Sequence, residues 1–160
     1  TIAPRGGAGG FVSPMLMEEV STQDINEIIS EIKMYLGSFV AEKLKFGVTT
    51  GGVTADFEYA LKRARFMVYS VGMGKSGYLG NFSRILSKTG DMVISETTKA
   101  KLDEDVQDIL KTCQKELEEL FTKEMPILDR LAQELIKKET LNYEEIDAIF
   151  KEFNLSRPAA

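Results

Sequence analysis

Apolar residues recur at helical spacing over several long stretches of the chain, so that their side chains gather on one face of an α-helix. The first stretch predicts a helix over residues 22–46. Ser21 or Thr22 is expected to cap it, Ser21 forms a weakened capping box with Asp24, and Gly47 ends it in a left-handed conformation. Its stripe consists of Ile25, Ile28, Ile29, Ile32, Leu36, Phe39, Val40 and Leu44.

A second helix is predicted over residues 55–71, with Thr54 as its N-cap and Gly72 as its terminator. Its expected buried residues are Phe57, Leu61, Ala64 and Val68. Residues 73–94 read as an irregular connection, in which two β-prone runs around residues 88–91 leave a hairpin open.

The longest helix is predicted from Ser95 to about Lys123, and Pro126 is expected to break or kink it near Met125. A further helix should follow the proline, and Asn142 with Glu145 should cap a last short helix. The stripe of the long helix consists of Leu102, Val106, Ile109, Leu110, Cys113, Leu117, Leu120 and Phe121, and that of the next helix of Ile127, Leu128, Leu131, Leu135 and Ile136.

The first 20 residues are rich in glycine and proline, and we expect residues 11–16 to be extended. Pro14 cannot donate to a β-ladder, which favours a sheet edge. The predicted fold is mainly α: a helical bundle with a small N-terminal β or extended segment. We expect one domain over residues 1–160, divided into an edge segment (1–20), site helices (21–72), a connection (73–94) and C-terminal helices (95–153).

Composition narrows the function without assigning one. The chain has 160 residues, a formal charge of −5 and a pI near 5.0, which argues against a nucleic-acid surface. A lone cysteine excludes an internal disulfide and indicates a reducing compartment. No run approaches the roughly 20 apolar residues that span a bilayer. Because the chain does not begin with Met, we expect it to be a piece of a longer protein, in which a membrane anchor is not excluded.

Most of the motifs that could carry chemistry are better interpreted as structural features than as functional sites. "GMGKSG" at residues 72–77 lacks the earlier glycine of a phosphate loop and follows a predicted helix, so it reads as a plain loop. The chain contains no histidine, so neither Cys113 nor a serine has the usual base. Cys113 falls on an apolar stripe and is expected in the core. Paired glutamates read as solvated faces, and the methionines as core filling.

One carboxylate stands out in "TTGGVTADFEYA" at residues 49–60. Asp56 lies in the first turn of a predicted helix, directly behind two glycines. It could be a capping charge, which is favourable near a helix N-terminus. It could equally be a metal ligand. The residues alone leave both interpretations open.

Five segments, in order, resemble the proteolytic domain of the FtsH family of membrane-anchored AAA+ zinc metalloproteases. "TIAPRGG" is similar to the family's "TIIPRGG", and "YLGSFVAEKLKFGVTTGG" to "LLGGRAAEELIFGEVTTGA". "ADFEYALKRARFMVYSVGM" resembles "NDLERATEIARRMVTEWGM", "LDEDV" resembles "IDEEV", and "LIKKETLNYEEI" resembles "LLEKETLDGEEI".

The resemblance implies a zinc metalloendopeptidase coupled to an ATPase. In the family, two histidines of an HExxH helix and the aspartate of "TTGASNDLE" bind zinc, and Asp56 matches that aspartate. The segment after "PRGG" borders the cleft, so Gly10, Phe11 and Val12 are expected to bind substrate as an extended strand. The family further implies ATP bound in a separate domain, a homo-hexamer, membrane and unfolded proteins as substrates, and the cytoplasmic face of a bacterial inner membrane or an equivalent organelle membrane.

Departures from the pattern leave alternatives open. The HExxH helix is expected some 20 residues before Thr1, so this chain alone should be inactive and should not hold zinc tightly. The run Gly-Gly-Val-Thr-Ala before Asp56 is one residue longer than the loop usual in the family. Phe39 and Tyr59 stand where the family segments have arginine. A degenerate family member that serves as an oligomeric assembly or chaperone platform is one alternative. A helical interaction module is another.

Overall fold

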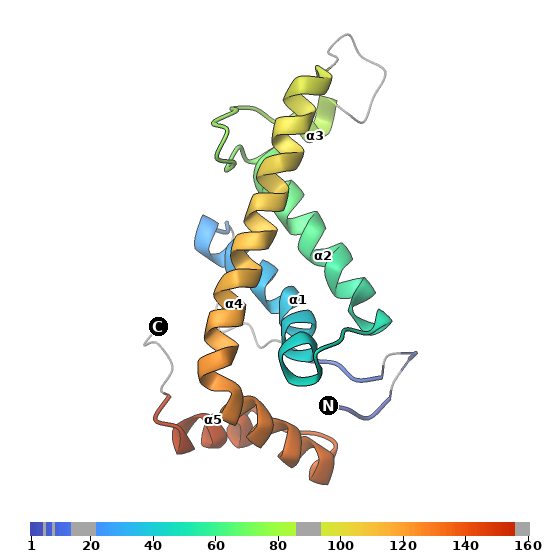
Figure 1. Cartoon of the computed structure of the whole chain (residues 1–160), viewed down its shortest axis with the longest axis vertical. Coiled ribbons are helices and arrows are strands. Elements are labelled where there is room, and N and C mark those ends of the chain that lie inside the picture. The colour runs from blue at the N-terminus through green and yellow to red at the C-terminus, as the bar shows by residue number, and fades with distance from the viewer. Residues whose placement is uncertain (5, 8, 14–21, 86–93, 156–160) are drawn as a thin grey trace. The chain divides into compact units, whose positions relative to one another are not determined.

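The structure is a computed structural model that describes residues 1–155 apart from residues 5, 8, 14–21 and 86–93. It contains helices α1 (Ile25–Phe46), α2 (Thr54–Arg65), α3 (Phe82–Ile85), α4 (Glu96–Lys138) and α5 (Tyr143–Glu152), a 3-10 helix η1 (Gly51–Val53) and a π-helix η2 (Phe66–Ser70) (Figure 1). No strand occurs in the described part of the chain. The predicted mainly α fold is therefore confirmed.

The chain divides into two compact units. The core unit comprises Val20–Leu120, and the terminal unit comprises Thr1–Glu19 with Phe121–Ala160. The expectation of one domain stays a prediction. Within the described residues, no helix combines the length and the apolar character needed to cross a bilayer.

Helix α1 begins later than its predicted cap. Asp24 is the N-cap residue: its side chain accepts hydrogen bonds from the backbone N–H groups of Asn26 and Glu27 at 2.7 and 2.9 Å. The Glu27 carboxylate accepts from the Asp24 N–H at 2.8 Å, which completes a capping box. The predicted box with Ser21 is therefore wrong in register, because Asp24 with Glu27 forms the full motif. Gly47 ends the helix at φ 71°, as predicted.

Apolar residues of α1 and α4 form the centre of the core unit. The predicted stripe of α1 is buried at its middle and exposed at its ends, where Ile25 and Leu44 lie. Leu120 of α4 is also half exposed, which corrects its predicted place in the core. The buried residues of these stripes are Ile28, Ile32, Leu36, Val40, Leu102, Val106, Ile109, Cys113 and Leu117.

The second helix has a different buried face from the one predicted. Phe57 and Leu61 are each 40% exposed, whereas Ala60 and Ala64 are buried where α2 contacts α1. After Arg65 the backbone continues as the π-helix η2. Its wider turn departs from the 3.6-residue period, which accounts for three consecutive buried residues. These are Met67, Val68 and Tyr69.

The loop after η2 is held by a buried carboxylate on α4. Asp105 is 6% exposed and accepts hydrogen bonds from the backbone N–H and the hydroxyl of Ser76. A Cβ at Gly74 would overlap this carboxylate, so the close approach requires glycine. The segment "GMGKSG" therefore acts as a structural loop. The predicted hairpin around residues 88–91 lies outside the described residues.

Helix α4 continues through Pro126, so the predicted break does not occur, while the kink predicted as its alternative stays a prediction. A proline inside a helix removes one backbone hydrogen bond and costs about 3 kcal/mol. Ile127, the next residue, is buried, and full burial of such a side chain contributes about 1.5 to 3 kcal/mol. Packing of this order offsets the cost. Asn142 and Glu145 form the predicted capping box of α5.

Candidate functional site

Asp56 lies in the first turn of α2, where its carboxylate faces α1. The Ser38 hydroxyl donates a hydrogen bond of 2.7 Å to Oδ2 of Asp56. Asp56 is half-buried, and no Lys or Arg of the described residues forms an ion pair with it. Its place in the first turn of α2 is also favourable for a negative charge near a helix N-terminus, so the contact with Ser38 adds to the capping-charge interpretation without excluding it.

The segment before Asp56 is fixed by a second contact with α1. The Glu42 carboxylate accepts from the Thr50 N–H at 2.7 Å and from the Thr50 hydroxyl at 3.0 Å. The Thr50 Oγ1 in turn accepts from the Gly52 N–H at 3.2 Å and caps η1. Thr54 was predicted as the N-cap of α2; instead it is the first residue of that helix, and Thr50 takes a capping role one turn earlier.

Two aromatic pairs join α1 and α2 beside this segment. The Phe39 and Phe57 rings lie 5.0 Å apart, and the Tyr35 and Tyr59 rings stack at 5.3 Å. Such pairs add about 0.5 to 1.5 kcal/mol beyond their burial. Phe39 and Tyr59 occupy the positions where the resembling family segments carry arginine. The loss of these charges is evident from the sequence, whereas the pairing of the rings is not.

An apolar cavity of about 370 Å³ opens between these helices and α4 in the core unit. Phe39 and Phe57, the neighbours of Ser38 and Asp56 in sequence, form one side of it. The remaining lining residues are Leu36, Ala60, Leu61, Gln107, Leu110, Lys111 and Gln114. The cavity is largely apolar, and neither Ser38 nor Asp56 lines it.

The donor set for a metal within this chain is limited. Groups of three or more His, Cys, Asp or Glu side chains that could hold a metal ion are absent from the described residues. The whole sequence contains no histidine. A carboxylate oxygen is nevertheless an ordinary zinc donor. Asp56 has no cationic partner among the described residues, so its carboxylate is chemically compatible with one position of a zinc site.

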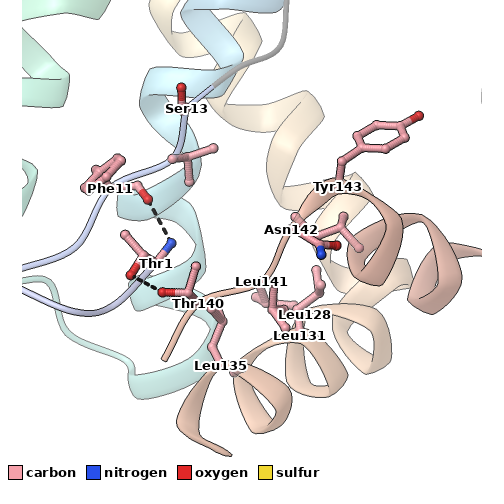
Figure 2. A pocket seen from close by; sticks show the side chains of 13 residues that line it. Thr1, Phe11, Ser13, Leu128, Leu131, Leu135, Thr140, Leu141, Asn142 and Tyr143 are labelled. Carbon is pink, nitrogen blue, oxygen red and sulfur yellow. Dashed lines mark hydrogen bonds between the residues drawn. The ribbon is translucent and has the colours of Figure 1, made fainter. Parts of the chain in front are cut away.

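The predicted substrate-binding residues lie in the terminal unit. Thr1 and Phe11 exchange two backbone hydrogen bonds of 3.0 Å, the pattern of an antiparallel pair. Figure 2 draws the bond from the Thr1 nitrogen to the Phe11 carbonyl oxygen. A Cβ at Gly10 would lie 2.8 Å from the Thr1 carbonyl oxygen, so this crossing requires glycine. Val12 is 86% exposed. The extended character predicted for residues 11–16 is thus described only as far as residue 13; residues 14–16 lie outside the described part.

A groove of about 840 Å³ runs beside this pair (Figure 2). The Thr1 hydroxyl lies 2.8 Å from that of Thr140 and donates to the Glu139 carbonyl at 3.0 Å, which fixes the N-terminal segment on the end of α4. The apolar lining residues are Phe11, Val12, Leu128, Leu131, Ala132, Leu135, Leu141 and Ile146. Of these, Leu128, Leu131 and Leu135 were predicted as a helix stripe and Phe11 and Val12 as substrate-binding residues, whereas the groove itself was not predicted.

Two buried ionisable side chains have structural roles. Burial raises the pKa of the Cys113 thiol, which disfavours the nucleophilic thiolate. Burial, followed by the hydrogen bond to Asp103, raises the pKa of Tyr69 to about 12. Arg65 stacks on the Tyr69 ring at 4.3 Å and pairs with Asp103 at 3.1 Å. These contacts tie η2 to α4.

Comparisons with known proteins give one consistent result. The model of Peptidase family M41 matches residues 1–149. Proteins named "ATP-dependent zinc metalloprotease FtsH" are 32% identical to this chain in Aster yellows witches'-broom phytoplasma over 152 residues and in Bacillus subtilis over 156 residues. These matches cover 93% and 91% of this chain, but 21% and 24% of the relatives. The chain spans less than a quarter of the length of these relatives.

Proposed function

The chain belongs to peptidase family M41, and from this premise we propose that it forms part of the peptidase domain of a longer ATP-dependent zinc metalloendopeptidase. The resemblance found in the sequence is thereby confirmed. In this proposal Asp56 is the carboxylate ligand of the catalytic zinc, and two imidazoles come from outside the chain. The observation that supports it is the position of Asp56, which has no cationic partner among the described residues and accepts a hydrogen bond from Ser38.

The proposed chemistry requires little of this chain beyond binding and orientation. A zinc ion bound at such a site lowers the pKa of its water to about 7 and polarises the scissile carbonyl. Asp56 contributes an oxygen ligand, while Ser38 and Glu42 hold the segment that carries it. The aromatic pairs stabilise the contact between α1 and α2 from which Asp56 projects.

We further propose that Gly10, Phe11 and Val12 bind the substrate backbone. In extended chain the N–H and C=O of one residue point to the same side, and those of its neighbours to the other. Phe11 directs both groups to Thr1, so Gly10 and Val12 direct theirs to the opposite edge. That edge can accept an extended peptide by main-chain pairing.

The longer protein would supply the rest of the machinery. We propose an ATPase domain that unfolds membrane and cytoplasmic protein substrates, a membrane anchor, and assembly into a homo-hexamer at the cytoplasmic face of a bacterial or organelle membrane. This part of the proposal rests on the family and on the names of the relatives, which include the words ATP-dependent and zinc.

Peptide hydrolysis by the longer protein tests the function. We expect Asp56→Asn to reduce hydrolysis more than about 100-fold, since even outer-shell partners of metal ligands contribute 10- to 100-fold. Glu58→Gln is the matched control, because Glu58 lies on the same helix and pairs with Lys62 on its exposed side. Equal activity of the two variants would return Asp56 to a structural role. A wild-type protein without hydrolysis would favour the assembly-platform alternative.

A further inference from the structure

Ser30 and Ser38 are both exposed residues of α1, and their hydroxyl groups donate to different kinds of acceptor. Ser30 donates to the Asn26 carbonyl one turn earlier, the usual arrangement for serine within a helix. Ser38 instead donates across the helix contact to Oδ2 of Asp56. Its hydroxyl is therefore committed to the one carboxylate that the proposed function assigns to the metal.

The hydrogen bond from Ser38 to Asp56 holds one end of the segment 50–56, and a contact from Glu42 holds the other end. Glu42 lies one turn after Ser38 on α1 and binds the backbone and side chain of Thr50. Residues four apart lie on the same helix face. The face of α1 that carries Ser38 and Glu42 therefore holds both Thr50 and Asp56, between which lie the glycines of η1.

The hydrogen bond also distinguishes the two oxygens of the carboxylate. Oδ2 accepts from Ser38, whereas Oδ1 has no hydrogen-bond donor among the described residues. A hydroxyl that occupies one oxygen restricts rotation of the carboxylate and leaves the other oxygen available to a cation. Contacts of this kind orient metal-binding carboxylates and are outer-shell determinants of affinity.

We propose that Ser38 is a positioning residue that orients the Asp56 carboxylate for zinc, an inference that rests on the proposed function. The resembling family segment has glycine at the position of Ser38. The hydroxyl is therefore a feature of this chain, and it fixes the orientation of the aspartate.

The test is zinc affinity of the longer protein, measured by competition with a chromophoric chelator. Ser38→Ala should weaken zinc binding about 10- to 100-fold, the range for loss of an outer-shell partner. Ser38→Thr, which keeps the hydroxyl, should stay within about threefold of wild type. Ser30→Ala removes a hydroxyl from the same helix and should leave affinity unchanged. The absorption spectrum of the Co²⁺-substituted protein should change in Ser38→Ala and not in Ser30→Ala.

The outcomes separate this inference from the function on which it rests. If Asp56→Asn abolishes zinc binding and Ser38→Ala binds zinc like wild type, the positioning role is wrong and the ligand assignment stands. Equal weakening by Ser38→Ala and Ser38→Thr would also overturn the role of the hydroxyl. If Asp56→Asn leaves zinc binding intact, both the ligand assignment and the positioning role fall.

Discussion

The Tyr69 hydroxyl donates a hydrogen bond of 2.7 Å to the Asp103 carboxylate, which joins η2 to α4 inside the core unit. Arg65, one helical turn before Tyr69, binds the same oxygen of Asp103. A phenol that is buried and donates to a carboxylate resists ionisation, because the phenolate would lose its hydration and lie against a negative charge. This relationship gives the fold a defined response to alkaline pH.

Alkaline stability should fall as Tyr69 ionises. Its pKa is about 12 in the folded protein, against the ordinary tyrosine value of 10.0 that applies to the unfolded chain, so between these values the folded state retains a proton that the unfolded state loses. The stabilisation is fully present below pH 10 and is lost as pH rises towards 12. Over this window the free energy of unfolding should fall by about 2 to 3 kcal/mol more in wild type than in Tyr69→Phe. Urea titrations at several pH values measure the free energy of unfolding of both proteins. The same pH dependence in wild type and Tyr69→Phe between the two pKa values would contradict the prediction.

The backbone of Gly10 lies so close to that of Thr1 that residue 10 should not accept a side chain. In Gly10→Ala the added Cβ would lie 2.8 Å from the Thr1 carbonyl oxygen and 3.2 Å from the Ile2 Cα, both backbone atoms. We expect the amides of Phe11 and Ile2, which donate to Thr1 and Glu139, to lose their protection from hydrogen exchange.

Gly9→Ala provides the matched control, since a Cβ at Gly9 meets nothing within 4 Å. It should leave both amides protected. Equal exchange in the two variants would mean that the Thr1 pairing does not depend on the close approach at Gly10.

The proposed substrate edge can be tested at Val12, whose N–H points away from Thr1. Val12→Pro removes this donor, and we expect KM for a peptide substrate of the longer protein to rise about 5- to 10-fold, the loss of one hydrogen bond of about 1 kcal/mol. Val12→Ala keeps the N–H and trims only an exposed side chain. A proline variant with the KM of the alanine variant would exclude main-chain pairing at this residue.

The sequence predicted those elements whose signals are local. The capping box of Asn142 and Glu145 and the left-handed Gly47 depend on a few neighbouring residues, and both are confirmed. The α1 stripe follows from the helical period alone, and its middle residues Ile28, Ile32, Leu36 and Val40 are buried as predicted.

The predictions from sequence are wrong where contacts between helices determine which residues are buried or where a helix ends. A π-turn after Arg65 shifts the buried face, and the close contact of α2 with α1 selects Ala60 and Ala64 over Phe57 and Leu61. Helix α4 continues past Pro126, where the sequence predicted a break or a kink. Asp56 was identified through family resemblance, whereas Ser38 carries no signal in sequence, since only the register between two helices places its hydroxyl against the carboxylate.

The zinc content of the longer protein, purified as wild type and as Asp56→Asn, tests the central claim most directly. We predict about one zinc per chain in wild type and a loss of more than about tenfold in Asp56→Asn after dialysis against a weak chelator, with unchanged helical content by circular dichroism. Glu58→Gln should retain the metal. Full zinc occupancy in Asp56→Asn, or a wild-type protein that binds no zinc, would contradict the assignment of Asp56 as a ligand.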